Sequence, residues 1–276
     1  MKRLLFNQGV MTRILAAVVV VLSWSDVLIA QVSQERETGP FKAIENRSSV
    51  DLFIYQGASP RVVVEADESA VGKVQTWVEG DVLIVDLDRC PMSVRTLKAH
   101  ITVTDLERLI VNGSGNVTTE MPLNSPHLDV KVNGSGDVSL KIAVGELSLR
   151  LNGSGDADVQ GTSRTSFIAV NGSGDLDFEG GTMEACTVKL AGSGDIEVSG
   201  STGTLEIKHI SSGDLDAGKL LAGSCSIEKS GSGDTSVWVD GDLSIDASGS
   251  GDVYYRGKAH IMSLNVTGSG EVSQIH

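Results

Sequence analysis

Apolar and polar residues alternate along most of the second half of the chain. Residues 128–132 (LDVKV), 147–151 (LSLRL) and 186–190 (CTVKL) each place an apolar residue at every second position. Such alternation is typical of a β-strand with one buried face, because successive side chains point to opposite faces. No stretch shows a helical period long enough for a crossover helix. The pattern therefore predicts an all-β protein.

A glycine-rich motif follows each alternating stretch and occurs nine times. The first copy, NGSGN, ends at Asn116, seven copies end in Asp, and the last, TGSGE, ends at Glu271. The last residues of successive copies are 18 to 21 positions apart. A second alternating piece, such as DVSL or DIEV, follows each motif, and a looser turn completes the period. Each repeat is therefore interpreted as strand, tight glycine turn, strand and variable turn.

Two arrangements of these strands fit the pattern. Antiparallel hairpins would pair neighbouring strands within a repeat, whereas a parallel β-helix stacks each strand on its copy in the next repeat, about 4.8 Å away. The β-helix is favoured because identical residue types recur at the repeat period and would stack in columns. An amide ladder is expected from Asn112, Asn133, Asn152 and Asn171. The predicted fold is an all-β, single-stranded right-handed parallel β-helix with about 19–20 residues per coil.

The glycine motif is interpreted as the corner of each coil. Its glycines are expected to supply backbone torsions that a side chain forbids. Its Ser and Asp side chains are expected to bond N–H groups of their own turn.

The chain divides into three parts. Residues 109–276 hold the repeated coils, and residues 31–108 lack the glycine corner but keep strand alternation. We interpret 31–108 as an irregular N-terminal β cap or irregular first coils, because a solenoid needs its end strands covered. The C-terminal end has less obvious cover, although Trp238, Tyr254 and Tyr255 are candidates to close the core. Exposed solenoid ends also make end-to-end or other homo-oligomeric association an open alternative.

Residues 1–30 have the pattern of a signal peptide. Basic residues precede a nine-residue apolar run at 14–22, and small residues follow it. The run is shorter than the roughly 20 residues that span a bilayer. Cleavage is expected after Ser25 or Ala30, which would leave no stable membrane span; an uncleaved anchor is the alternative. The protein is then expected in the periplasm, at the cell surface or outside the cell.

The charge of the chain limits its partners. The formal net charge is −14, and removing residues 1–30 removes three basic residues and one acidic residue, which gives about −16. Such a surface repels nucleic acid and anionic lipid. Divalent cations and basic surfaces are more compatible partners.

Stacked coils would place acidic residues in two columns. The residue that ends each motif forms the first column, which we call position zero, and the residue two positions later points the same way. Four coils would then present paired carboxylates, namely Asp156 with Asp158, Asp175 with Asp177, Asp195 with Glu197, and Asp214 with Asp216. One hypothesis is a calcium-binding stripe of these eight residues. The other is that each position-zero Asp accepts hydrogen bonds in its own turn and the second column is solvated surface.

Other candidate groups have simpler explanations. A basic column of Lys131, Arg150, Lys189 and Lys208 is interpreted as a solvated face that balances the acids. Cys186 and Cys225 fall at equivalent inward positions two repeats apart, about 10 Å from each other, so buried free thiols are expected. His209 takes an inward position and is interpreted as a core histidine with satisfied hydrogen bonds. Neither a structural zinc motif nor a specific catalytic triad is indicated.

Several motifs together resemble a known family. The repeated NGSGD, the opening FKAIENRSSVDLFIYQG at 41–57, and the closing SGSGDVYYRG at 248–257 are similar to the putative auto-transporter adhesin head GIN domain family. The resemblance covers about residues 41–276 and implies an exported bacterial β-helical protein. It supplies no catalytic residues to transfer. The chain leaves no room after the ninth repeat for a translocator barrel, so self-transport is not expected.

These observations predict an exported, non-catalytic, structural or adhesin-like module with no cofactor, whose partner is a cell-surface glycan or protein. One alternative is a calcium-dependent glycan-binding module, and a second is a polysaccharide-active enzyme. The enzyme alternative is weaker because the acids belong to the repeat itself, whereas an active site needs residues that break the repeat.

Overall fold

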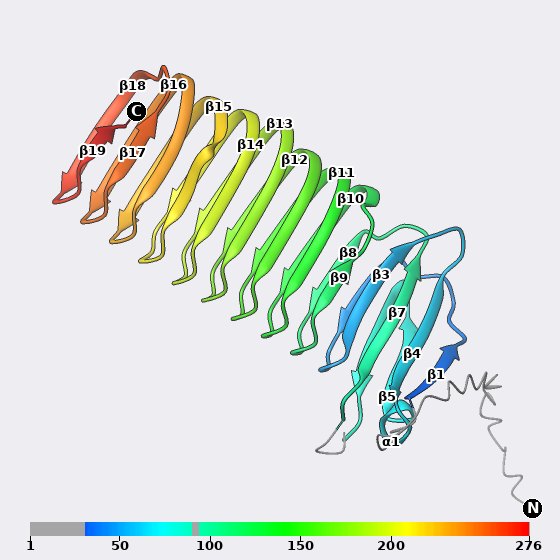
Figure 1. The fold of residues 1–276 in the computed structure, drawn as a ribbon. Coiled ribbons are helices and arrows are strands. Elements are labelled where there is room, and N and C mark those ends of the chain that lie inside the picture. The colour runs from blue at the N-terminus through cyan, green and yellow to red at the C-terminus, as the bar shows by residue number, and fades with distance from the viewer. Residues whose placement is uncertain (1–30, 90–93, 276) are drawn as a thin grey trace, which may run out of the picture.

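The computed structural model describes residues 31–89 and 94–275. The proposed signal peptide and Cys90 lie outside these residues. The described chain forms a parallel β-helix with an irregular cap at its N-terminal end (Figure 1). Among the described residues, no helix has the length and apolar character needed to span a membrane.

The coils of the β-helix are built from strands that pair in parallel with the preceding coil. The strands of this part are β8 (Arg108–Val111), β9 (Val117–Thr119), β10 (Leu123–Val132), β11 (Val138–Leu151), β12 (Ala157–Val170), β13 (Leu176–Leu190), β14 (Ile196–His209), β15 (Leu215–Gly231), β16 (Thr235–Gly249), β17 (Val253–Arg256), β18 (His260–Gly268) and β19 (Val272–Gln274).

Strands β11 to β16 run through the segment for which the sequence pattern predicted a variable turn. Each of them is a single strand of 14 to 17 residues that bends around the coil and pairs on both sides of the bend. Differences in repeat length are absorbed by register shifts within these strands, for example between Gly161 and Thr165. The prediction of two strands separated by a second turn was therefore wrong, because β-bulges accommodate an extra residue without ending a strand.

The cap contains both parallel and antiparallel strand pairs. It comprises β1 (Gln31–Arg36), β2 (Ala43–Asn46), β3 (Asp51–Gln56), β4 (Arg61–Asp67), the short helix α1 (Glu68–Val71), β5 (Val74–Glu79), β6 (Val82–Leu87) and β7 (Leu97–Val103). Strands β2 and β3 stack in parallel on β8 and β9 and so form a coil. Beyond that coil, β4 pairs antiparallel with both β1 and β7, and β5 pairs antiparallel with β6.

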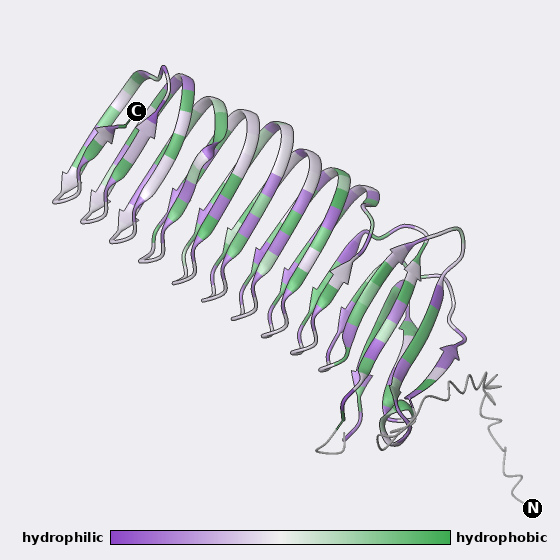
Figure 2. Cartoon of the chain, in the orientation of Figure 1, coloured by the Kyte–Doolittle hydropathy of each residue, from purple (hydrophilic) through white to green (hydrophobic). Residues whose placement is uncertain are grey.

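The core is a set of columns inside the coils. Leu128 stacks on Leu147 and Val130 on Leu149, and all four side chains are buried. Hydrophobic and hydrophilic residues alternate along every coil (Figure 2). Burial of one such side chain contributes about 1.5–3 kcal/mol, so the columns supply much of the stability.

The corners bring the main chains of successive coils into direct contact. The N–H of Ser173 donates to the carbonyl of Gly153 (3.0 Å), and the N–H of Asn171 donates to the carbonyl of Leu151 (2.8 Å). A Cβ atom on Gly174 would overlap the carbonyl oxygen of Gly155 in the preceding coil.

The expectation that the corner glycines supply special torsions is wrong for the NGSGD corners, where their φ angles are not in the left-handed region. These glycines are required by the close approach of the coils. In the last three corners the first glycine does have positive φ, as in Gly231 (131°).

We predict that Gly174→Ala lowers the stability of the protein by about 1–3 kcal/mol, because the new methyl group must push two hydrogen-bonded coils apart. Urea denaturation followed by circular dichroism measures the effect. Gly72→Ala is the matched control, since Gly72 has ordinary φ and open space around its Cβ position. Equal urea midpoints for the two variants would contradict this account of the corner.

Candidate functional site

The position-zero acids form a ladder of hydrogen bonds between coils. The Oδ1 atom of Asp156 accepts the backbone N–H of Asp175 (2.8 Å), and Oδ1 of Asp175 accepts that of Asp195 (2.8 Å). The same bond recurs along the column from Asp51, through Asn116, Asp137, Asp195, Asp214 and Asp234, to Asp252, which accepts the N–H of Glu271. The expectation that these acids bond their own turn is therefore wrong. Each of these acids accepts an N–H group of the next coil instead.

The second acidic column stacks as predicted but does not share this ladder. Asp158 lies beside Asp177, Asp177 beside Glu197, and Glu197 beside Asp216 on consecutive parallel strands. Three of the four side chains are exposed and Glu197 is half-buried.

The two columns line one groove that crosses four coils. Its volume is about 460 Å³. All eight acids that the sequence predicted line it, together with Ala157, Leu176 and Ile196, whose side chains are buried in the core. The structure thus brings the whole predicted stripe together on one surface.

Charge repulsion in the groove is visible at its centre. Burial, together with the neighbouring carboxylates of Glu197 and Asp158, raises the pKa of Asp177. One cation reaches the groove, because Nζ of Lys219 pairs with Glu197, and this hydrogen bond raises the pKa of Lys219. The groove is therefore a concentrated and incompletely compensated negative surface.

The stripe does not have the geometry of a preformed metal site. Within residues 31–89 and 94–275, no three His, Cys, Asp or Glu side chains are placed to hold one metal ion together. One oxygen of each position-zero acid is already bonded to a backbone N–H, for example Oδ1 of Asp195 to Asp214. Calcium binding by the eight acids stays a prediction.

The amide ladder and the basic column are both present. Nδ2 of Asn152 donates to Oδ1 of Asn133 (2.8 Å), and the neighbouring pairs repeat the bond. In the basic column, Arg150 pairs with Asp129 (2.9 Å) and stacks on Phe167. These contacts match a solvated face with local ion pairs.

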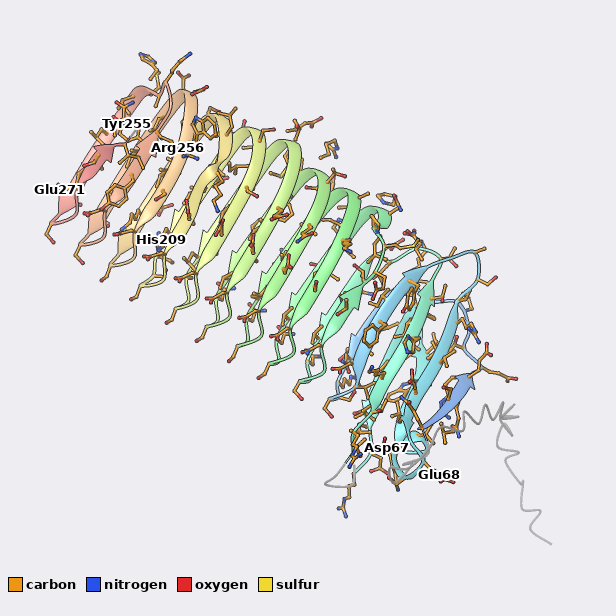
Figure 3. All side chains as sticks on the ribbon, viewed as in Figure 1. Asp67, Glu68, His209, Tyr255, Arg256 and Glu271 are labelled. Carbon is orange, nitrogen blue, oxygen red and sulfur yellow. The ribbon has the colours of Figure 1, made fainter. Side chains whose placement is uncertain are left out.

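The aromatic residues near the last coils are engaged in structural contacts. The guanidinium of Arg256 stacks on Trp238, 4.6 Å from the ring centre (Figure 3 labels Arg256), and the hydroxyl of Tyr254 donates to Asp252 (2.9 Å). Tyr255 packs partly against the core. Trp238, Tyr254 and Tyr255 do not close the end of the core, because the strands β18 and β19 lie beyond them.

A second aromatic cluster lies on the cap and was not predicted. The ring of His100 stacks between Phe53 (5.2 Å) and Tyr55 (6.2 Å), and its Nε2 lies 3.0 Å from Glu65. Phe53 and Tyr55 sit at alternate positions of β3, which is a signal for a shared face. Their contact with His100 joins residues more than 40 positions apart and has no local signature.

The interior becomes polar in the C-terminal half of the β-helix. His209 is fully buried next to its corner (Figure 3), with Nδ1 2.7 Å from Oγ1 of Thr235 and Nε2 2.7 Å from the carbonyl oxygen of Gly213. Lys229 stacks on His209 in the next coil and is buried, and its Nζ atom has no hydrogen-bond partner among the described residues. Burial lowers the pKa of both groups. The prediction of a satisfied core histidine is confirmed, whereas Lys229 was missed.

The thiols occupy the inward positions predicted for them. Cys186 and Cys225 are buried and free, and Leu205 separates them in the column. Burial raises the pKa of each thiol to about 12. Both are therefore unreactive core residues.

We predict that Asp177→Asn stabilises the protein at pH 7. The folded-state pKa of Asp177 is raised, so the ionised carboxylate lowers stability above that pKa, and this cost disappears as the pH falls below about 3.8. Thermal unfolding midpoints at pH 7 and at pH 3.5 measure the difference between variant and parent. Glu206→Gln, which removes an exposed acid outside the groove, is the control. A lower midpoint for Asp177→Asn at pH 7 would show that its carboxylate has a structural role.

We also predict that Lys229→Met raises stability near neutral pH by about 1 kcal/mol or more. The variant replaces a buried ammonium without a hydrogen-bond partner in the described part of the chain by an apolar chain of similar length, and the desolvation cost of the ammonium outweighs its attraction to Asp214, Asp234 and Asp252. The folded-state pKa of Lys229 is lowered, so the penalty is present below the folded pKa and vanishes above the unfolded value of 10.5. Urea midpoints at pH 7 and pH 10.5 test both statements. Lys208→Met, which removes an exposed lysine paired with Glu228, is the control and is not expected to stabilise the protein.

The fold recurs in solved structures of bacterial proteins. A structure titled putative lipid binding protein from Parabacteroides distasonis is 23% identical, covers 89% of this chain and 97% of its own, and has a TM-score of 0.66. A putative adhesin from Parabacteroides merdae has 19% identity, coverages of 89% and 96%, and a TM-score of 0.61. Another putative adhesin from Parabacteroides distasonis has 20% identity, coverages of 89% and 97%, and a TM-score of 0.61. At these identities the likeness shows the fold alone.

The family is shown by the sequence. No curated protein matches the chain. The family described as putative auto-transporter adhesin, head GIN domain, matches residues 40–199 and 184–259, which together cover most of the chain and include the acidic groove and eight of the nine glycine corners. The resemblance seen in the motifs is confirmed: the chain belongs to the head GIN domain family of putative auto-transporter adhesins.

Proposed function

We propose that this protein is an exported, non-catalytic, adhesin-like module that contacts a cell-surface partner through the acidic groove. The observation that carries the proposal is the groove itself, in which two columns of carboxylates run side by side across four coils. A straight line of like charges on a rigid solenoid favours contact with an extended or repetitive partner, since each coil offers the same groups at the same spacing.

The two acidic columns have different roles in this proposal. Position-zero acids such as Asp175 hold neighbouring coils together through their ladder bonds. The second column, with Asp177 and Glu197 at its centre, is free of the ladder and supplies the contact surface. Its carboxylates are available to basic groups of a protein or, through a bridging cation, to the hydroxyl groups of a glycan.

A non-catalytic role agrees with the uniformity of the position-zero column. Asp195 makes the same bond to the next coil as Asp175 and Asp214 do. Catalytic acids normally differ from their neighbours in environment, because their pKa values must be set individually. The names of the family and of the related structures, adhesins and a binding protein, point in the same direction.

Calcium-dependent glycan binding is the second candidate. It is favoured by the raised pKa of Asp177, since a divalent cation between Asp158, Asp177 and Glu197 would offset the repulsion that these carboxylates share. Small side-chain rotations would then have to bring ligands of neighbouring coils within about 2.3–2.6 Å of the ion.

We predict that neutralising the second column abolishes adhesion without unfolding the protein. In the variant Asp158→Asn/Asp177→Asn/Glu197→Gln/Asp216→Asn, four side chains outside the ladder lose their charge and keep their shape. Binding of the labelled protein to a glycan array and to intact cells is measured, and retention should fall at least about tenfold relative to the parent. The control variant neutralises four exposed acids outside the groove, Glu120, Glu184, Glu206 and Asp246, and should bind like the parent.

The same assay distinguishes the two candidates. Retention that is lost in EDTA and restored by calcium but not by magnesium indicates the cation-bridged glycan. Calcium at a hundred times its Kd should then also raise the free energy of unfolding by about 2.7 kcal/mol, which is seen as a higher thermal midpoint. Retention that is insensitive to EDTA indicates direct contact with a basic surface. Retention by the groove variant equal to that of the parent would refute the proposed function.

A further inference from the structure

The last coil that the structure describes leaves the hydrophobic core open. Ile261, Leu264 and Val266 of β18 stack on Leu243, Ile245 and Ala247, which are buried, and so continue three interior columns. All nine residues of β18 are nevertheless exposed. Leu264 and Val266 expose 53% and 41% of their surface at positions that every preceding coil buries.

The main chain of this coil is open as well. Strand β18 pairs with β16, and β19 pairs with β17, so the opposite edge of each strand has no pairing partner in the described chain. Natural edge strands are usually protected by Lys, Pro or inward-pointing charges. The sequence of β18, HIMSLNVTG, contains none of these.

The N-terminal end is built differently and does not complement this edge. There the sheet ends in β1, which runs antiparallel on β4, and in β5, which runs antiparallel on β6. These end strands carry Glu35, Arg36 and Glu79. The repeating parallel register that β18 and β19 would extend is therefore interrupted at the other end of the molecule.

The C-terminal coil is also nearly neutral in a strongly acidic protein. Residues 253–275 contain Arg256, Lys258 and Glu271 as their Lys, Arg, Asp and Glu residues, against a net charge of −14 for the whole chain. Two copies approaching through this end meet little of the repulsion that separates their other faces. A two-fold axis makes the end complementary to itself, because an edge strand rotated by 180° pairs antiparallel with its own copy.

We propose that the C-terminal coil is a self-association surface through which two copies join tail to tail. Strand β18 of one copy pairs antiparallel with β18 of the other, and Ile261, Leu264 and Val266 are buried against their counterparts. The interface closes on itself, so association stops at the dimer. The proposal does not depend on the acidic groove, which lies on other coils and stays free on both copies.

Light scattering coupled to size exclusion tests the proposal at several protein concentrations. The parent protein is expected at twice the monomer mass at micromolar concentration. The Leu264→Asp variant should elute as a folded monomer, because its dimer would have to bury the new carboxylate in the interface. Met121→Asp, at an equally exposed apolar side chain on a distant turn, should remain dimeric. A monomeric parent at all concentrations, or a dimeric Leu264→Asp variant, would overturn the proposal.

Disulfide trapping tests the geometry. In a Cys90→Ser background, Asn265→Cys places a thiol near the middle of β18, and oxidation should give a covalent dimer. Ser33→Cys on β1 is the matched control and should stay monomeric on denaturing gels. The buried Cys186 and Cys225, whose pKa is raised to about 12, do not compete. A third variant carries both Asn265→Cys and Ser33→Cys. If only this double variant forms cross-links, or if it forms species larger than the dimer, the copies stack head to tail and the tail-to-tail arrangement is refuted.

Discussion

Direct main-chain contact between successive corners is the constraint on which this structure depends. The N–H of Ser173 reaches the carbonyl of Gly153, and a Cβ on Gly174 has no space. The second glycine of the corner must therefore recur in each coil that follows the same path, as it does in all nine corners. Once the corners are fixed at hydrogen-bonding distance, every side chain stands above its counterpart in the preceding coil. Core columns, the amide ladder and the acidic columns all follow from this single spacing.

Stacking converts one favourable residue into a line of identical residues, with a cost where that residue is charged. At position zero the cost is offset, because each carboxylate accepts a backbone N–H from the following coil, as Asp156 does from Asp175. Two positions later the described acids do not accept an N–H from the following coil; Asp216 instead accepts that of Gly218 in its own coil, and the pKa of Asp177 is raised. Two columns of the same residue type thus differ in physical status. The first column is part of the scaffold. The second column carries negative charge that is not fully compensated and is available to a partner.

The sequence predicted the features that depend on the length of the repeat and on the alternation of inward and outward positions along each strand. The alternation in 147–151, the column of Asn133 and Asn152, and the inward thiols of Cys186 and Cys225 all follow from counting residues. The spacing of the coils was predicted, but the groups that meet across neighbouring corners were not, so the reason for the glycines and the acceptor role of Asp175 were misjudged. Contacts across non-repeating segments were also out of reach. His100 meets Phe53 and Tyr55 because β7 lies beside β3, a pairing that no local pattern encodes.

The two ends of the solenoid solve the same physical problem in different ways. At the N-terminal end, β4 pairs antiparallel with β7 and β5 pairs antiparallel with β6, which ends the parallel stacking. Helix α1 adds Ala70 and Val71 to the core at this end. Towards the C-terminal end one interior column passes from Leu190 through His209 and Lys229 to Ala247 and Val266, so apolar contact is interrupted in that column. Coils with a weaker core and an open edge gain more from a partner than well-packed coils do, since covering the edge satisfies main-chain groups and buries the exposed columns at once. The stability of the last coils and the occupancy of that end are therefore coupled.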